Sequence, residues 1–221
     1  FLMSIKLYGF WRSLAAYRVR VALKLKKIDY QEIPVNLLAG EQHDPAYLAI
    51  NPQGAVPALV FPGIAQPLFQ SMAILDYLDQ VYPEPALLPS NPVERANVLA
   101  LCHVCASDGH PLVVPRVRNY LQNTLKLDEA SRNNWLQHWT LQSLMTYERV
   151  LTRNSDSGRY SHGDHVTMAD ICLASQIVGA GLFGCELSNL PRVMTIYSEL
   201  LKIKAFSDSM PMLQADAPKP K

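Results

Sequence analysis

The spacing of apolar residues changes along the chain and divides it near residue 84. Before that point, short segments that alternate apolar and polar residues are interleaved with segments that carry an apolar residue every three or four positions. Alternation is typical of β-strands and the longer period of α-helices, so this part predicts a mixed fold. After residue 84 nearly every segment has the helical period.

The first part predicts seven elements in the order β-α-β-α-β-β-α. A helix between the first two strands implies a crossover connection and therefore a parallel pair. The last two strands are close enough to form a hairpin across the Pro62-Gly63 turn. We expect strands at 4–9, 30–35, 58–61 and 67–70, and helices at 15–27, 44–50 and 71–83.

A proline-rich stretch separates the two parts. Pro83, Pro85, Pro89 and Pro92 cannot continue a helix, which predicts a linker at 84–92. The sequence therefore predicts an α+β domain at 3–83, an all-helical domain at 93–210 and a loosely held tail at 211–221. Within the helical part, Thr167 and Asp170 have the spacing of a capping box.

Composition and charge exclude several classes of protein. The 221 residues are 49% hydrophobic and 18% charged, which allows a sizeable core and excludes global disorder. The formal net charge of +1 gives no basic excess for nucleic acid or for a membrane surface, and we see no apolar run of transmembrane length. We also see no signal peptide and no disulfide framework, so we expect a cytoplasmic protein with reduced thiols.

The junction of the first strand and helix holds Trp11-Arg12-Ser13. A helix N-terminus offers unpaired N–H groups and a partial positive charge. The Ser13 hydroxyl can donate there to an anion such as a thiolate, and Arg12 can pair with a carboxylate. The alternative is that Ser13 only caps the helix.

Two later turns also carry main-chain or hydroxyl groups suited to a ligand. Pro57 directly precedes a strand, and a cis Val56–Pro57 bond would expose the N–H and C=O of Val56, although a trans turn is the commoner state. Gln70-Ser71 starts the last helix of the first part. There Ser71 either caps the helix or holds a ligand carboxylate at its positive end, and both roles are compatible.

The helical part offers weaker signals. Cys102 and Cys105 have C-x-x-C spacing, but no second pair completes a zinc site and the pattern is helical, so we expect two buried thiols and no metal. His110 and Arg116 lie on either side of a proline break, where a solvated face and a substrate-binding role are equally consistent with the pattern.

These segments in combination resemble the glutathione S-transferase family over nearly the whole chain, and its zeta class in particular. The matching stretches are WRSLAAYRVRVALKLKKIDYQEIPVNL, AINPQGAVPALV, QSMAILDYLDQVYP and GDHVTMADICL. The resemblance implies a thioredoxin-like domain followed by a helical bundle, glutathione as cosubstrate, and a homodimer. It also implies cis–trans isomerisation of a maleyl-type diacid, such as maleylacetoacetate or maleylpyruvate, by reversible thiolate addition.

The resemblance also implies roles for individual residues. Ser13 would donate a hydrogen bond to the glutathione sulfur, and Gln42 would reach the glycine end of the tripeptide. Val56, before a cis Pro57, would pair with the cysteinyl backbone. The γ-glutamyl carboxylate would be held by Gln70 and Ser71, and the second substrate by Arg12, His110 and Arg116.

The chain departs from the zeta pattern near the substrate. Ala15 stands where the class usually has a cysteine, Leu182 lies where an arginine is frequent, and Val113 and Val114 replace polar residues. These apolar replacements favour an alternative within the family, a transferase that conjugates or dehalogenates apolar electrophiles. An alternative of another class is a non-catalytic interaction module that has this fold but does not bind glutathione.

Overall fold

The computed structural model describes residues 4–153 and 157–219 and divides the chain into two compact units. The first unit contains the chain up to Ala86 together with the segment from Lys204 onward, and the second unit is Leu87–Ile203. The predicted helical domain at 93–210 thus includes a short stretch, from Lys204 to residue 210, that packs with the first unit instead. Residue 3 and residues 220–221, at the predicted ends of the first domain and the tail, lie outside the described residues.

The first unit has the predicted order β-α-β-α-β-β-α, with shorter strands than the sequence pattern suggested. Its regular elements are β1 (Lys6–Gly9), α1 (Leu14–Leu25), β2 (Gln31–Pro34), α2 (Pro45–Leu48), β3 (Ala58–Val60), β4 (Leu68–Phe69) and α3 (Ser71–Val81). A single 3-10 turn, Glu41–His43, precedes α2.

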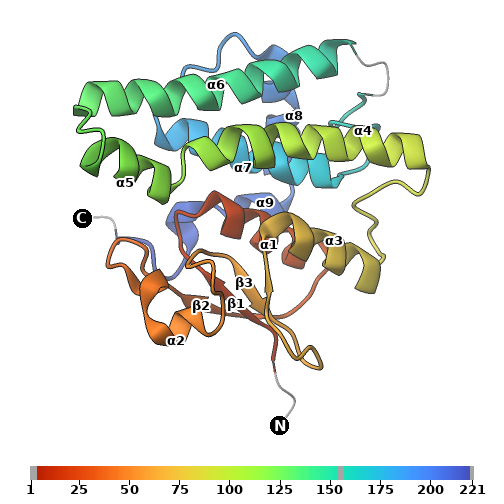
Figure 1. Ribbon diagram of the computed structural model, residues 1–221. Helices are drawn as coiled ribbons and strands as arrows, with labels where there is room; N and C mark the ends of the chain where they lie inside the picture. The colour runs from red at the N-terminus through yellow and green to blue at the C-terminus, as the bar shows by residue number, and fades with distance from the viewer. Residues whose placement is uncertain (1–3, 154–156, 220–221) are drawn as a thin grey trace. The chain divides into compact units, whose positions relative to one another are not determined.

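Four strands form one sheet in the order β2-β1-β3-β4. β1 pairs parallel with β2, whereas β1 with β3 and β3 with β4 are antiparallel, so the predicted crossover and hairpin are both confirmed. In Figure 1, α1 and α3 lie together on one side of the sheet and α2 lies on the other. Leu7 and Leu59, paired on neighbouring strands, are fully buried, as are Leu23 and Leu75 on the helices.

The tail predicted at 211–221 to be loosely held has several contacts with the first unit among its described residues, although Met212 and Leu213 are exposed. After the one-turn helix α9 (Lys204–Ser207), the chain forms a 3-10 turn at Pro211–Leu213 and continues along the first unit. Phe206, Ser209 and Pro211 are buried, and the Asp216 carboxylate accepts a hydrogen bond from Trp11. Within the described part of the tail, the buried Pro211 and the hydrogen bond of Asp216 are what attach the segment to the first unit.

The second unit is helical throughout its regular elements. These are α4 (Pro92–His103), a π-helical turn (Val104–Gly109), a 3-10 turn (His110–Leu112), α5 (Pro115–Asn123), α6 (Glu129–Arg153), α7 (Met168–Leu182) and α8 (Pro191–Leu201). Pro111 lies in the 3-10 turn and Pro115 begins α5, so the helical run is interrupted where the sequence predicted a break.

One helical run needs a correction to the sequence prediction. The run Pro92–Asn123 contains an 18-residue window with a mean hydropathy of 1.2, so by length and composition it passes a test for a membrane-spanning helix. A single run of this kind is weak evidence, because core helices of proteins outside membranes pass the same test. It passes because its charged residues are few, although the π and 3-10 turns interrupt its regular α-helical geometry.

The predicted capping box at the start of α7 is confirmed. Thr167 donates from its main-chain N–H and its hydroxyl to Asp170 Oδ2, at 2.8 and 3.0 Å. The other carboxylate oxygen accepts from the N–H of Ser161 at 2.8 Å. Asp170 is fully buried, and this burial raises the pKa of its carboxyl although the hydrogen bonds oppose the shift.

Candidate active site

Ser13 lies at the N-terminus of α1, where its position is compatible with both roles considered above: capping the helix and donating a hydrogen bond to an anion. It is the N-cap residue, and its Oγ accepts a hydrogen bond from the main-chain N–H of Ala16 at 3.1 Å. Because the hydroxyl oxygen is the acceptor in this cap, the hydroxyl hydrogen is still available to a ligand. The side chain is half-buried, and the positive end of the α1 dipole favours an anion there.

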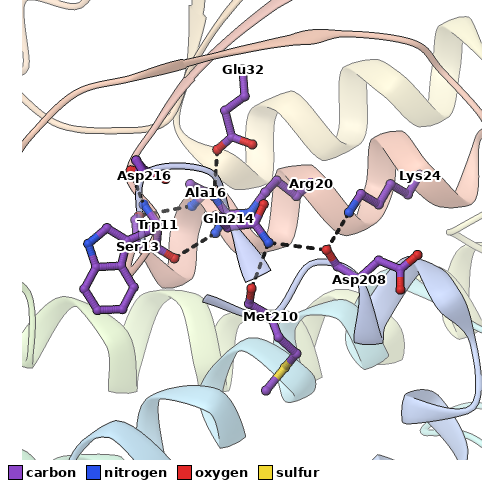
Figure 2. A network of polar contacts seen from close by, with 10 residues as sticks. All are labelled: Trp11, Ser13, Ala16, Arg20, Lys24, Glu32, Asp208, Met210, Gln214 and Asp216. Atoms are coloured by element: carbon purple, nitrogen blue, oxygen red, sulfur yellow. Dashed lines mark hydrogen bonds and ion pairs between the residues drawn. The ribbon is translucent and has the colours of Figure 1, made fainter. Parts of the chain in front are cut away.

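The peptide that precedes Ser13 is held by a buried arginine. Arg20 Nη2 donates to the Trp11 carbonyl at 3.1 Å, and Arg20 Nη1 forms an ion pair of 2.7 Å with Glu32 on β2 (Figure 2). Arg20 is 0% exposed, so its charge depends on Glu32 for compensation. A Cβ at Gly9 would lie 2.7 Å from Glu32 Oε1, so glycine is needed there for this ion pair.

The Val56–Pro57 bond is cis, as the resemblance implied, and β3 begins directly after it. The preceding carbonyl, that of Ala55, accepts from Tyr47 Oη and from Asn51 Nδ2, each at 2.6 Å. No hydrogen bond within residues 4–153 or 157–219 uses the main-chain N–H or C=O of Val56. The loop is therefore fixed while one of its peptide groups can still pair with an extended ligand.

The sequence allowed Ser71 to cap α3, and that assignment is wrong. The N-cap is Gln70, which has a φ of 67° and makes no side-chain cap bond, and Ser71 is the first helical residue. Ser71 is buried instead beside α1, where its Oγ accepts a hydrogen bond from Arg18 Nε at 3.0 Å. Since the oxygen is the acceptor, the hydroxyl hydrogen of Ser71 can still reach a ligand carboxylate.

Side-chain contacts bring the other predicted residues of the first unit together. Gln70 Nε2 donates to Gln53 Oε1 at 3.0 Å, which joins the start of α3 to the loop before Val56. Gln42 lies beside the same loop, because a Cβ at Gly54 would be 3.3 Å from its carbonyl oxygen. Gln42 Oε1 is buried and has no hydrogen-bond partner among the described residues.

Arg12 is half-buried, and its guanidinium has no hydrogen bond or ion pair within the described parts of the chain. It directly precedes Ser13, so the sequence places a cation beside the hydroxyl. A planar guanidinium in this position can pair bidentately with a carboxylate.

The two predicted residues of the second unit lie near its irregular turns. His110 is half-buried and begins the 3-10 turn, whereas Arg116 is an exposed residue of the first turn of α5. Val113, which the sequence suggested as part of an apolar substrate surface, is 3% exposed and belongs to the packing of this unit. Its apolar side chain is thus explained without any substrate.

The C-x-x-C pair agrees with the prediction of buried thiols. Cys102, Cys105 and Cys172 form no disulfide within the described residues and are fully buried. Burial, followed by a hydrogen bond with Cys172, raises the pKa of the Cys102 thiol well above its ordinary value. A thiol that resists ionisation is a poor nucleophile and a poor metal ligand.

Sequence reasoning missed the supporting residues Arg18, Arg20 and Tyr47. A signal was present for the arginines, since both lie inside an otherwise apolar helix in the run RVRVAL. Charged residues are almost never fully buried unless paired, so their position on a buried helix indicates partners. Tyr47 carried no comparable signal.

Comparisons with known proteins agree with this geometry. A family model described as the glutathione S-transferase N-terminal domain matches residues 3–80. The maleylacetoacetate isomerase of Pseudomonas aeruginosa is 40% identical over 216 residues, which are 97% of this chain and 99% of that protein.

Two solved structures extend the comparison to the fold. A maleylacetoacetate isomerase from Methylobacterium extorquens, crystallised with malonate and glutathione, has a TM-score of 0.93 and 45% identity, covering 97% of this chain and 100% of that one. A maleylpyruvate isomerase described as a bacterial zeta-class transferase has a TM-score of 0.93 and 38% identity, covering 96% and 100%. The predicted fold class, a thioredoxin-like domain with a helical second part, is thereby confirmed.

Proposed function

This chain belongs to the glutathione S-transferase family, and we propose that it catalyses the glutathione-dependent cis–trans isomerisation of a maleyl-type diacid such as maleylacetoacetate or maleylpyruvate. The observation that carries the proposal is the α1 N-terminus, where the Ser13 hydroxyl caps the helix by accepting and can still donate to an anion. The isomerase names of the full-length relatives support the choice of reaction.

Glutathione fits the groups that the first unit presents. We assign Ser13 to the sulfur, the main chain of Val56 to the cysteinyl backbone, and Gln42 to the glycine end. The γ-glutamyl carboxylate is assigned to Gln70 and Ser71 at the N-terminus of α3, where main-chain N–H groups and the helix dipole favour an anion. The Val56 peptide, whose main-chain groups have no hydrogen-bond partner among the described residues, supports this fit.

When bound, glutathione supplies a thiolate whose reversible addition to the cis double bond lets the former double bond rotate. A free thiol has a pKa of about 8.5 and is mostly protonated at neutral pH. The Ser13 hydroxyl and the α1 dipole both favour the charged form of the sulfur, so they lower that pKa. Arg12, beside Ser13, is assigned to a substrate carboxylate and to the negative charge that develops on the substrate.

We retain His110 and Arg116 as proposed substrate-binding residues of the second unit. Arg116 has the exposed guanidinium that a bidentate carboxylate contact requires, and His110 can donate a hydrogen bond. We further propose that the enzyme acts as a cytoplasmic homodimer, which light scattering of the purified protein and fractionation of its native cells would test. A monomer, or a protein found outside the cytoplasm, would contradict that part.

The isomerase proposal is tested by turnover of maleylpyruvate and maleylacetoacetate with glutathione at a concentration far below that of substrate. We expect complete conversion to the trans product while total glutathione stays constant, because the cosubstrate is returned in every cycle. A rate equal to the uncatalysed one would overturn the proposal.

The same glutathione balance separates the alternatives. Loss of glutathione in proportion to a chlorinated or aryl electrophile, with no isomerisation, would establish the conjugating transferase. Absence of heat in a calorimetric titration with glutathione would establish the non-catalytic module.

A further inference from the structure

The end of the chain reaches back to the turn that presents Ser13. The main-chain N–H of Trp11 donates to Asp216 Oδ2 at 2.8 Å, a contact between residues 205 positions apart in sequence (Figure 2). Trp11 is two residues before Ser13, and the N–H of Ser13 itself donates to the Phe10 carbonyl at 2.9 Å. The contact with Asp216 therefore acts on the tight turn from which α1 begins.

Residues 208–216, which we call the C-terminal strap, are themselves anchored on α1. Lys24 Nζ donates to the Asp208 carbonyl at 2.7 Å, on the last turn of the helix. Within the strap, Gln214 Nε2 donates to the carbonyls of Met210 and Asp208 at 2.7 and 3.3 Å (Figure 2). The buried Pro211 lies between these contacts. The strap therefore follows α1 from its C-terminus to its N-terminus.

Trp11 is held from two sides by charged groups. Its carbonyl accepts from Arg20, whose charge is balanced by Glu32, and its N–H donates to Asp216. The Arg20 contact comes from residues close in sequence. The Asp216 contact comes from the other end of the chain, and a hydrogen bond to a carboxylate is stronger than one between neutral groups.

We propose that Asp216 is a positioning residue for the glutathione thiolate, acting through the Trp11 N–H on the turn that carries Ser13. This inference rests on the proposed glutathione function. The hydrogen bond of Asp216 is to Trp11 and involves neither Ser13 nor Gln70 and Ser71, the proposed contacts of the γ-glutamyl carboxylate. Its removal thus leaves those contacts in place while the Ser13 hydroxyl loses its alignment with the sulfur.

The test compares Asp216→Ala and Asp216→Asn with the control Asp208→Asn. The control removes a carboxylate from the same strap but keeps the Asp208 carbonyl that Lys24 contacts. We expect kcat to fall about tenfold in Asp216→Ala with little change in the KM for glutathione, because small misplacements of reacting groups are costly. Asp216→Asn keeps an acceptor oxygen and should recover most of the rate, and Asp208→Asn should match the parent protein.

Two further readouts separate positioning from general damage. Ultraviolet absorbance of bound glutathione as a function of pH should show a higher thiol pKa in Asp216→Ala than in the parent or the control. Circular dichroism should show that all variants are folded, and if Asp216→Ala is not, Asp216→Leu, which is close in size to aspartate but has no acceptor, takes its place in the comparison with Asp208→Asn. Equal kcat values and equal thiol pKa values in the folded variants would overturn the inference.

Hydrogen exchange keeps this test independent of the proposed function. Without glutathione, we expect the Trp11 amide of Asp216→Ala to exchange about tenfold faster than in the parent, because its partner is lost. Unchanged exchange would overturn the inference even in an active enzyme. A parent protein that exchanges as expected but turns over no maleyl substrate would overturn the function and leave the strap contact standing.

Discussion

Two helices of the first unit and two of the second differ at their N-termini. In the second unit, buried carboxylates lie at the starts of α7 and α8: Asp170 accepts the hydrogen bonds at the start of α7, and Glu148 accepts from the N–H groups of Arg192 and Val193 at the start of α8, at 3.0 and 2.8 Å. In the first unit, α1 and α3 have no acidic residue in their first turns, and α3 has no side-chain cap.

This difference distinguishes helix N-termini that stabilise the fold from those that can bind a ligand. A helix N-terminus has N–H groups without partners in the helix, and either a protein carboxylate or a ligand anion can satisfy them. The closed ends of α7 and α8 stabilise the second unit. Under the proposed function, the open ends of α1 and α3 leave donors and positive potential for two anionic groups of glutathione, its central thiolate and its γ-glutamyl carboxylate.

The largest effect is expected from removing the carboxylate that accepts hydrogen bonds at the N-terminus of α7. Asp170→Ala removes the acceptor of three buried hydrogen bonds, and each unsatisfied donor costs about 1–3 kcal/mol. We expect the free energy of unfolding, measured with urea, to fall by about 3–5 kcal/mol. Asp170→Asn keeps an acceptor oxygen and should lose less. A loss below about 1 kcal/mol in the alanine variant would contradict the structural role of the closed end.

The second effect concerns catalysis at the open end of α1. Ser13→Ala and Ser13→Gly both remove the donor to the sulfur, and we expect kcat/KM to fall about 100-fold in each. Stability should separate them, because glycine is tolerated at an N-cap at a cost of only a few tenths of a kcal/mol whereas alanine costs about 1 kcal/mol. An active Ser13→Gly enzyme would show that Ser13 is only a cap.

A smaller effect is expected at the open end of α3. Ser71→Ala removes a proposed carboxylate contact and the acceptor of Arg18, so the Kd for glutathione should rise about tenfold, as expected for one hydrogen bond to a charged group. Titration calorimetry measures this change, and Ser71→Thr, which keeps the hydroxyl, is the matched control. Equal affinities in the alanine and threonine variants would exclude a role for this hydroxyl in binding.

The smallest effect is expected from adding a carboxylate to the first turn of α3. Ala73 is exposed and is the third residue of α3, so Ala73→Glu adds a carboxylate to the first turn. We expect stability to rise by about 0.3–1 kcal/mol while glutathione affinity weakens about two- to fivefold, since the new charge competes with the ligand carboxylate. Ala73→Gln should change neither quantity appreciably. A glutamate variant that binds glutathione as well as the parent would weaken the comparison.

The sequence predicted the element order of the first unit, the hairpin, the cap at Ser13 and the capping box at Thr167, because each depends on residues close together in the chain. Local patterns also predicted the break around Pro111. Ser71 was different, since its partner Arg18 lies 53 positions away and the local pattern favoured a cap. The surroundings of Val113 were likewise misjudged, because burial depends on packing from several helices.

The sequence by itself therefore predicted the order of the helices and strands, two helix ends suited to an anion, and the family to which the chain belongs. Tertiary structure alone decided what supports those ends: Arg20 paired with Glu32, Ser71 turned toward Arg18, and Asp216 against Trp11. The physical reason is the separation along the chain over which each interaction acts. Periodicity and capping act over a few residues, whereas a contact across 205 positions exists only after the whole unit has folded.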